Sequence, residues 1–151
     1  MRKRDMTFAS AVLEAIDALL ALAYIGLQIY YGVCYHIQVF KFVANILVLL
    51  LVYIAITWLQ HYPEKLNHIA AELCVGNIRK YSLRLLTFVK LVFTAGLLVP
   101  CVCDAFGIAI RDVYSLIMIG LILVVTAYYE YRIFQDITSL RTQYRRNKLQ
   151  L

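Results

Sequence analysis

The first long apolar segment of the chain, Met6 to Val33, carries two acidic residues where a membrane-spanning helix ordinarily has none. Along this segment, polar and small side chains recur at alternating intervals of four and three residues, the spacing of a single helix face. They are Ser10, Glu14, Asp17, Ala21, Tyr24, Gln28 and Tyr31. A lipid-facing Glu or Asp at the centre of a bilayer costs roughly 2.5 to 3.5 kcal/mol. We therefore expect this face to look into protein or water.

The chain as a whole is too apolar for a soluble domain. Hydrophobic residues make up 63% of its 151 residues, whereas typical soluble domains contain about 45 to 50%. A chain of this length has room for several spans of about 20 residues, but not for a separate catalytic domain of ordinary size. We expect residues 1–151 to form one all-α integral membrane domain.

Four apolar stretches predict a bundle of four transmembrane helices. Their approximate bounds are 8–33, 41–60, 83–102 and 113–131. Between the second and third spans, Pro63 at a first-turn position and Gly76 as a stop predict a short loop helix over 63–75. After the last span, an apolar stripe flanked by charge predicts that the helix extends into the tail, 132–151.

The basic residues orient the predicted bundle. Twelve of the fifteen Lys and Arg residues lie at the N-terminus, between the second span and the first turn of the third, or in the tail. Of the basic residues, only Lys41 and Arg111 fall in the two other loops. The positive-inside rule then places both termini, the loop helix and the tail in the cytoplasm. We expect anionic lipid at that face as the partner of these charges, and no nucleic acid. By analogy with small multi-span bacterial effectors and accessory subunits, the expected location is a prokaryotic inner membrane.

A lysine within the third span offers a partner for the acidic residues of the first. Counted from the basic ends of the two spans, Lys90 and Glu14 differ in depth by about one helical turn, which a Lys side chain can bridge. We predict an intramembrane ion pair between Lys90 and Glu14 or Asp17. The alternatives are that Lys90 reaches the inner surface alone, or that both acids lie at that surface. Asn45 in the second span is expected to face another helix.

Other chemistry in the sequence is sparse. Cys34, Cys101 and Cys103 fall on the predicted outer side, where a disulfide from Cys34 to either of the others is permitted; free buried thiols are the alternative. The histidines lie in loops or at span ends and lack metal-ligand spacing, and no phosphate-binding glycine loop or nucleophile elbow is present. We expect no cofactor, no metal site and no enzymatic activity.

Two functions fit these features. In the first, several copies form a homo-oligomeric ion channel or pore, in which the acidic face of span one lines a cation path and the cytoplasmic segments gate it through a regulator. In the second, the chain is a non-conducting accessory or anchor subunit of a larger membrane complex. If Lys90 neutralises an acid of span one within the same chain, the polar face is mainly structural. The pairing of Lys90 therefore distinguishes the channel from the accessory subunit. The candidate polar seam comprises Ser10, Glu14, Asp17, Tyr24, Gln28, Asn45, Lys90 and Thr94.

Overall fold

The computed structural model is all-helical. It describes residues 8–34, 39–66, 74, 76–110 and 113–149, and no strand occurs in these residues. The elements are α1 (Phe8–Cys34), α2 (Val39–His61), the short 3-10 helix η1 (Pro63–Lys65), α3 (Gly76–Ala105) and α4 (Val113–Leu149). In this part of the chain, 4 helices are long and apolar enough to cross a membrane. The predicted all-α, multi-pass plan is therefore confirmed.

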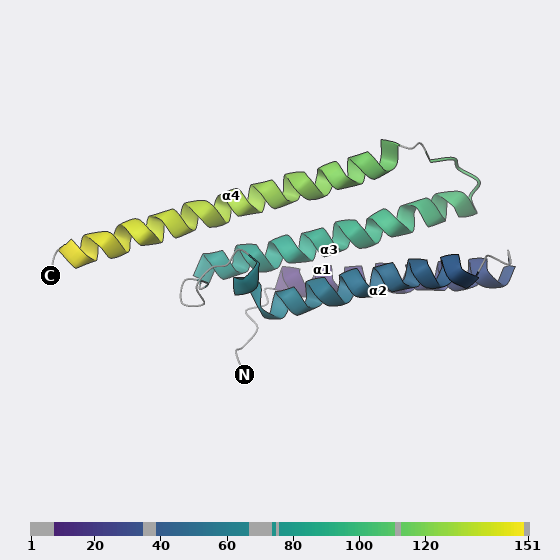
Figure 1. Cartoon of the computed structure of the whole chain (residues 1–151), viewed down its shortest axis with the longest axis horizontal. Helices are drawn as coiled ribbons and strands as arrows, with labels where there is room; N and C mark the ends of the chain where they lie inside the picture. The colour runs from purple at the N-terminus through teal and green to yellow at the C-terminus, as the bar shows by residue number, and fades with distance from the viewer. Residues whose placement is uncertain (1–7, 35–38, 67–73, 75, 111–112, 150–151) are drawn as a thin grey trace.

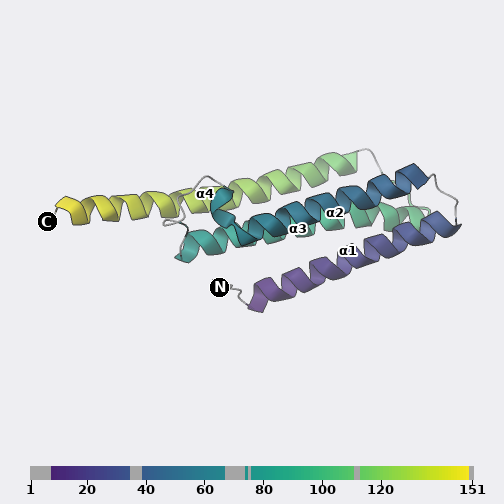
Figure 2. The ribbon, with the colours of Figure 1, turned by 60° about the horizontal axis from the view of Figure 1, so that its bottom comes forward.

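Helix α3 is the centre of the arrangement. It packs against α1, α2 and α4, whereas α4 packs against α3 alone among the described elements. In Figure 1, α4 lies on one side of α3 while α1 and α2 overlap on the other. In the turned view of Figure 2, α2 lies in front of α3, and α1 and α4 lie on opposite sides of them. The start of α1 and the end of α4 lie toward the same end of the molecule (Figure 1). We call this the termini end, and the opposite one the far end.

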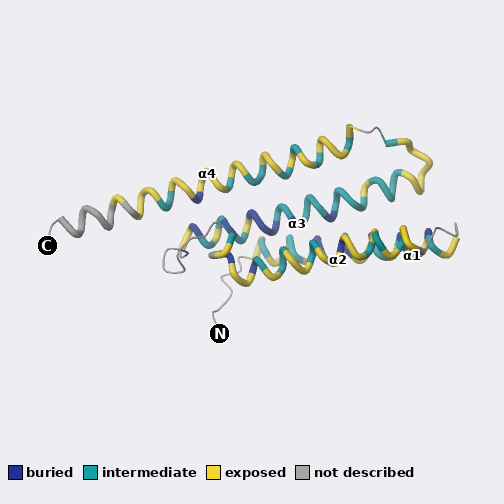
Figure 3. Tube along the Cα trace, viewed as in Figure 1, coloured by how far each residue is buried: buried dark blue, intermediate teal, exposed yellow. Residues whose placement is uncertain are grey.

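Burial follows this arrangement. Buried positions gather along α3 and on the sides of α1 and α2 that face it, while α4 is mostly exposed or half-exposed (Figure 3). Within the most apolar part of α4, 0% of the residues are buried. Large apolar side chains such as Leu116, Leu123 and Val124 point outward. A helix with this outward apolar surface suits a bilayer, where lipid tails replace water around it.

Helix boundaries match the predicted spans closely except in α3. The prediction starts this helix at about residue 83, but the structure starts it at Gly76. The early turns are polar on average, yet Ile78 and Ser82, four residues apart, are both buried. The predicted span, about 83–102, lies within this helix, which begins earlier because hydropathy marks only the apolar core, whereas an amphipathic helix continues beyond it. At 30 residues, α3 is about 45 Å long against a hydrocarbon core of about 30 Å.

The connection after α2 begins where the sequence predicts. Pro63 starts η1, and the backbone N–H of Leu66 donates to the carbonyl of Pro63 at 3.2 Å. The described part of the predicted loop helix is therefore a single 3-10 turn. Its residues 67–73 and 75 lie outside the described residues, as do the basic N-terminus and Arg111.

Helix α3 ends in a Schellman motif. Gly107 has φ +67°, the left-handed conformation that glycine adopts without a steric penalty. Its N–H donates to the carbonyl of Asp104 at 3.0 Å, and the N–H of Ile108 donates to that of Cys103 at 2.8 Å. Two terminal carbonyls of α3 are thereby satisfied, and the last turn holds Asp104 at the far end.

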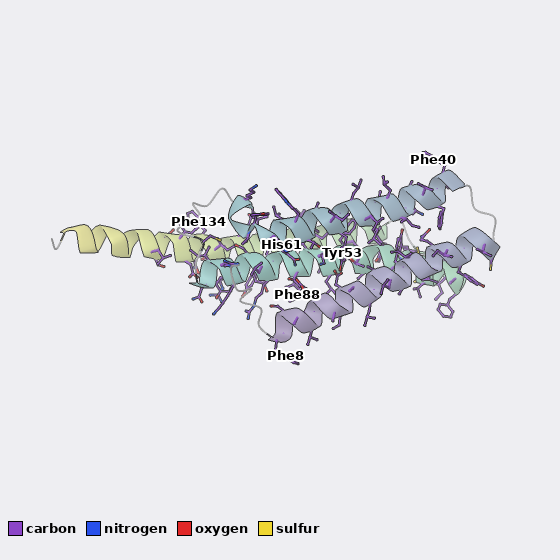
Figure 4. All side chains as sticks on the ribbon, turned by 90° about the horizontal axis from the view of Figure 1, so that it is seen from below. Phe8, Phe40, Tyr53, His61, Phe88 and Phe134 are labelled. Carbon is purple, nitrogen blue, oxygen red and sulfur yellow. The ribbon has the colours of Figure 1, made fainter. Side chains whose placement is uncertain are left out.

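Helix α4 runs without a break through the predicted tail. Its 37 residues correspond to about 55 Å, far more than a bilayer core requires. Figure 4 places Phe134 beside the first turns of α3, and from there α4 extends past the other helices. Next to it, Ile133 is only 1% exposed. We call residues 132–149 the α4 extension.

Candidate functional site

The predicted polar face of α1 is the face that the molecule buries. Its buried residues are Asp17, Ala21, Tyr24, Gln28 and Tyr31. Nearer the start of the helix, Ser10 and Glu14 are half-buried. Because α1 packs against α2 and α3, this face is sheltered by protein of the same chain.

Two opposite charges meet in this sheltered region. Lys90 Nζ of α3 lies 3.5 Å from Asp17 Oδ2 of α1, and their side chains are 4% and 0% exposed. Of the two acids that the sequence offers to Lys90, the structure brings Asp17. Mutual attraction in a low-dielectric interior offsets part of the cost of removing both charges from water. The pair thus neutralises the α1 face within one chain.

Helix α2 supplies further contacts to the ammonium group. Lys90 Nζ donates to Thr57 Oγ1 at 3.5 Å and lies 4.1 Å from the centroid of the Tyr53 ring. Tyr53 sits midway along α2 in Figure 4. Desolvated cation–π contacts contribute up to about 2 kcal/mol. The sequence analysis missed both residues, although Asn45, Leu49, Tyr53 and Thr57 recur every four residues on one face of α2.

The carboxylate of Asp17 has fewer partners than the ammonium. Neither Asp17 oxygen accepts a hydrogen bond from the described residues. Thr94, which is 0% exposed, donates its hydroxyl to the backbone carbonyl of Lys90 at 2.9 Å and is satisfied within its own helix. Lys90 is therefore the group that neutralises Asp17. We call Asp17, Tyr53, Thr57, Lys90 and Thr94 the ion-pair site.

A second polar group, nearer the far end, joins three helices. Gln28 Nε2 donates to Cys101 Sγ at 3.3 Å, and Asn45 Nδ2 donates to Gln28 Oε1 at 3.4 Å. The Tyr31 hydroxyl donates to the carbonyl of Cys101 at 3.1 Å. Asn45 thus contacts a neighbouring helix, α1. Hydrogen bonds between membrane helices average about 0.6 kcal/mol, so they mainly fix orientation. We call Gln28, Tyr31, Asn45 and Cys101 the amide cluster.

Apolar packing separates the ion-pair site from the amide cluster. Along α1, Ala21 and Tyr24 lie between Asp17 and Gln28, and both pack in a buried cluster with Leu49 of α2. Tyr24 is only 3% exposed. Five of the predicted seam residues therefore lie in two separate polar groups within the monomer rather than in one continuous file: Asp17, Lys90 and Thr94 in the ion-pair site, and Gln28 and Asn45 in the amide cluster.

The predicted outer cysteines are free thiols in the structure. Cys34 is exposed, and Cys101 and Cys103 are half-buried. The disulfide that their location permits is not formed. Instead, the sulfur of Cys101 accepts the hydrogen bond from Gln28.

One polar contact fastens α4 to α3. Pro100 lacks an N–H, so the carbonyl of Gly96, four residues earlier, loses its usual helical donor. The hydroxyl of Tyr114 donates to this carbonyl at 3.3 Å. The side chain of α4 thus replaces a hydrogen bond that proline removes from α3.

Tyr114→Phe should therefore destabilise the protein by about 0.6 kcal/mol and by no more than about 1.7 kcal/mol, because it returns the Gly96 carbonyl to an unpaired state. Unfolding in mixed detergent micelles measures this difference. Tyr62→Phe, which removes a hydroxyl from an exposed ring at the end of α2, is the control and should leave the midpoint unchanged. Equal effects of the two substitutions would contradict the role of the Tyr114 hydroxyl.

Metal ligation finds no support in the described ranges, where no group of three or more His, Cys, Asp or Glu side chains could hold an ion. The buried polar groups are instead the ion-pair site and the amide cluster, with Gln60 donating to Thr87 Oγ1 at 3.2 Å as a further contact between α2 and α3.

No protein family, characterised protein or solved structure matches the chain.

Proposed function

We propose that the chain is a non-conducting membrane subunit that anchors the α4 extension at the membrane surface. The observation that supports this function best is the Lys90–Asp17 pair, closed within one chain with Asp17 0% exposed. An acid neutralised in this way needs no water-filled axis around it. The polar face of α1 then serves to hold α1, α2 and α3 in one orientation, which is the mainly structural role of a paired seam.

The part that such an anchor displays is strongly basic. Residues 132–149 include Arg132, Arg141, Arg145, Arg146 and Lys148. Each basic residue near an anionic leaflet contributes about 1 kcal/mol of attraction. With both termini in the cytoplasm of a prokaryotic cell, the extension would lie against anionic lipid of the inner membrane and present its remaining face to a regulator or larger complex.

A homo-oligomeric cation pore is the second candidate, and Glu14 is the residue that favours it. Glu14 is half-buried and makes no ion pair or hydrogen bond within the described part of the chain. Rings of carboxylates from several copies favour cations. In this assembly Glu14, rather than the paired Asp17, would line the axis.

Cation flux through reconstituted liposomes discriminates between the two functions. We expect vesicles containing the parent protein to release potassium no faster than protein-free vesicles, because Asp17 is paired and no continuous polar file crosses the monomer. Glu14→Gln vesicles should behave identically. The same samples are examined by light scattering in detergent to give the mass of the assembly.

Potassium release that exceeds the protein-free rate and disappears in Glu14→Gln would overturn the anchor and establish the pore. Potassium release that is unchanged in Glu14→Gln would also overturn the anchor, and it would mean that the ions follow a path other than the α1 face. The anchor is supported if potassium release equals that of protein-free vesicles and the protein either has a monomeric mass or co-purifies with a larger complex from the native membrane.

A further inference from the structure

A cavity opens between the far ends of α1, α2 and α3. Its volume is about 420 Å³, within the usual range of about 300 to 1,000 Å³ for small-ligand sites. The amide cluster forms one wall, and Pro100, Asp104 and the segment 108–110 after α3 complete the lining. Sequence reasoning did not single out Asp104, because an acid in a predicted outer loop is ordinarily a solvated surface group.

The cavity places polar groups at a depth where the surrounding helices are apolar. Asn45 lies six residues into α2, about 9 Å from its start at Val39. Asn45 is nevertheless exposed, and it is one of the residues that line this cavity. A primary amide facing hydrocarbon would lose its hydrogen bonds, whereas one facing a polar cavity keeps them.

The charge of the lining is acidic. Asp104 supplies a carboxylate, and its side chain is exposed without a hydrogen bond or ion pair within the described residues. Among the residues that the structure describes, the lining includes no Lys or Arg. The amide oxygens of Gln28 and Asn45 add acceptors, since each has a lone pair beyond the hydrogen bonds described above.

We propose that this cavity binds an ammonium group, with the Asp104 carboxylate as its counter-ion and the amide oxygens of Gln28 and Asn45 as its hydrogen-bond acceptors. An ammonium carries three donors and no acceptor, which matches a lining of one carboxylate and several neutral oxygens. Pro100, Ile108 and Ile110 provide apolar walls for the carbon atoms next to the nitrogen.

Two sources can deliver this group. The cavity begins at the last turn of α3, which holds Asp104, and reaches about two helical turns inward to Asn45. Its mouth therefore lies at the depth of the lipid headgroups, and its inner end at the edge of the hydrocarbon, when α1 to α3 span a bilayer. The ethanolamine headgroup of phosphatidylethanolamine therefore has access from the membrane, and a small soluble amine has access from the aqueous side.

The test uses the full chain in dodecyl maltoside, whose uncharged headgroup contains no amine. Saturation-transfer NMR measures binding of ethylammonium, with ethanol as the uncharged comparison. Native mass spectrometry measures retention of phosphatidylethanolamine from an equimolar mixture with phosphatidylglycerol. We expect parent protein to bind at least one ammonium compound and Asp104→Asn to weaken that binding about tenfold, because a charge-assisted hydrogen bond is lost.

The matched control is Glu130→Gln, which removes one negative charge from an exposed residue of α4 that does not line the cavity. It should leave both measurements unchanged. Binding of ethylammonium that depends on Asp104 supports the proposal with a soluble source, and retention of phosphatidylethanolamine that depends on Asp104 supports it with a lipid source. The proposal is overturned if neither compound binds, or if Asp104→Asn and Glu130→Gln alter binding equally. Neither outcome bears on the anchor, which liposome flux tests separately.

Discussion

Lys90→Met should destabilise the protein by about 3–5 kcal/mol, the cost of leaving one partner of a buried ion pair uncompensated. Methionine keeps the length and the apolar stem of lysine but removes the ammonium group. Asp17, which is 0% exposed and accepts no hydrogen bond from the described residues, would then lose its ion-pair partner. Unfolding in mixed detergent micelles, monitored by circular dichroism, measures the loss.

The double variant Asp17→Leu/Lys90→Met separates charge from packing. Buried ion pairs replaced by apolar residues of similar volume are often as stable as the parent, so the double variant should recover most of the stability that Lys90→Met loses. The coupling between the two positions follows from the double-mutant cycle. Additive losses at the two sites would contradict a direct interaction.

Lys80→Met is the matched control for the single substitution. Lys80 lies on the same helix, ten residues before Lys90, but its side chain is exposed. Surface substitutions of this kind usually change stability by less than about 0.5 kcal/mol. An equal loss in Lys80→Met and Lys90→Met would show that any lysine in α3 matters, and would remove the ion-pair site as the explanation.

The buried face of α1 could be predicted from the sequence because it depends on helical periodicity alone. Polar residues confined to one face of an apolar helix identify the side that avoids lipid, whatever covers it. Asp17, Tyr24, Gln28 and Tyr31 are all buried as that rule requires. The four spans could also be predicted from the sequence, since their length and hydropathy reflect the thickness of a bilayer.

The partner of Lys90 depends on the axial register of α1 against α3, which periodicity does not determine. Glu14 and Asp17 are three residues apart, a difference of about 4.5 Å along the helix. The contributions of Tyr53 and Thr57 were hidden for a related reason. In an almost uniformly apolar helix, a tyrosine and a threonine resemble ordinary interruptions until the rotation of α2 is known.

The early start of α3 and the unbroken length of α4 share one cause. Both helices extend beyond the apolar stretch at the termini end, where their exposed sides are polar and hydropathy falls. The buried residues Ile78 of α3 and Ile133 of α4, each 1% exposed, indicate that packing continues there without a membrane-like composition. Hydropathy therefore predicted the spans of these two helices, and the apolar stripe flanked by charge predicted the extension of α4, but neither pattern predicted the early start of α3.

Ile133→Ala should destabilise the protein by about 2–5 kcal/mol, the range for removing a large buried aliphatic side chain. Ile133 is 1% exposed, and α3 is the only described element against which α4 packs. The loss should therefore appear as a loosened contact between the α4 extension and the start of α3. Faster amide hydrogen exchange in residues 132–149 and in the first turns of α3, compared with the parent, measures it.

Phe134→Ala is the control, since it removes a larger side chain that is 68% exposed in the neighbouring position. It should leave hydrogen exchange and stability nearly unchanged, within about 0.5 kcal/mol. An anchor can present a helix in a defined direction only if that helix is fixed to the membrane part. Equal effects of the two substitutions would mean that Ile133 does not hold the α4 extension against α3. The extension would then be a free tail rather than a helix with a fixed direction.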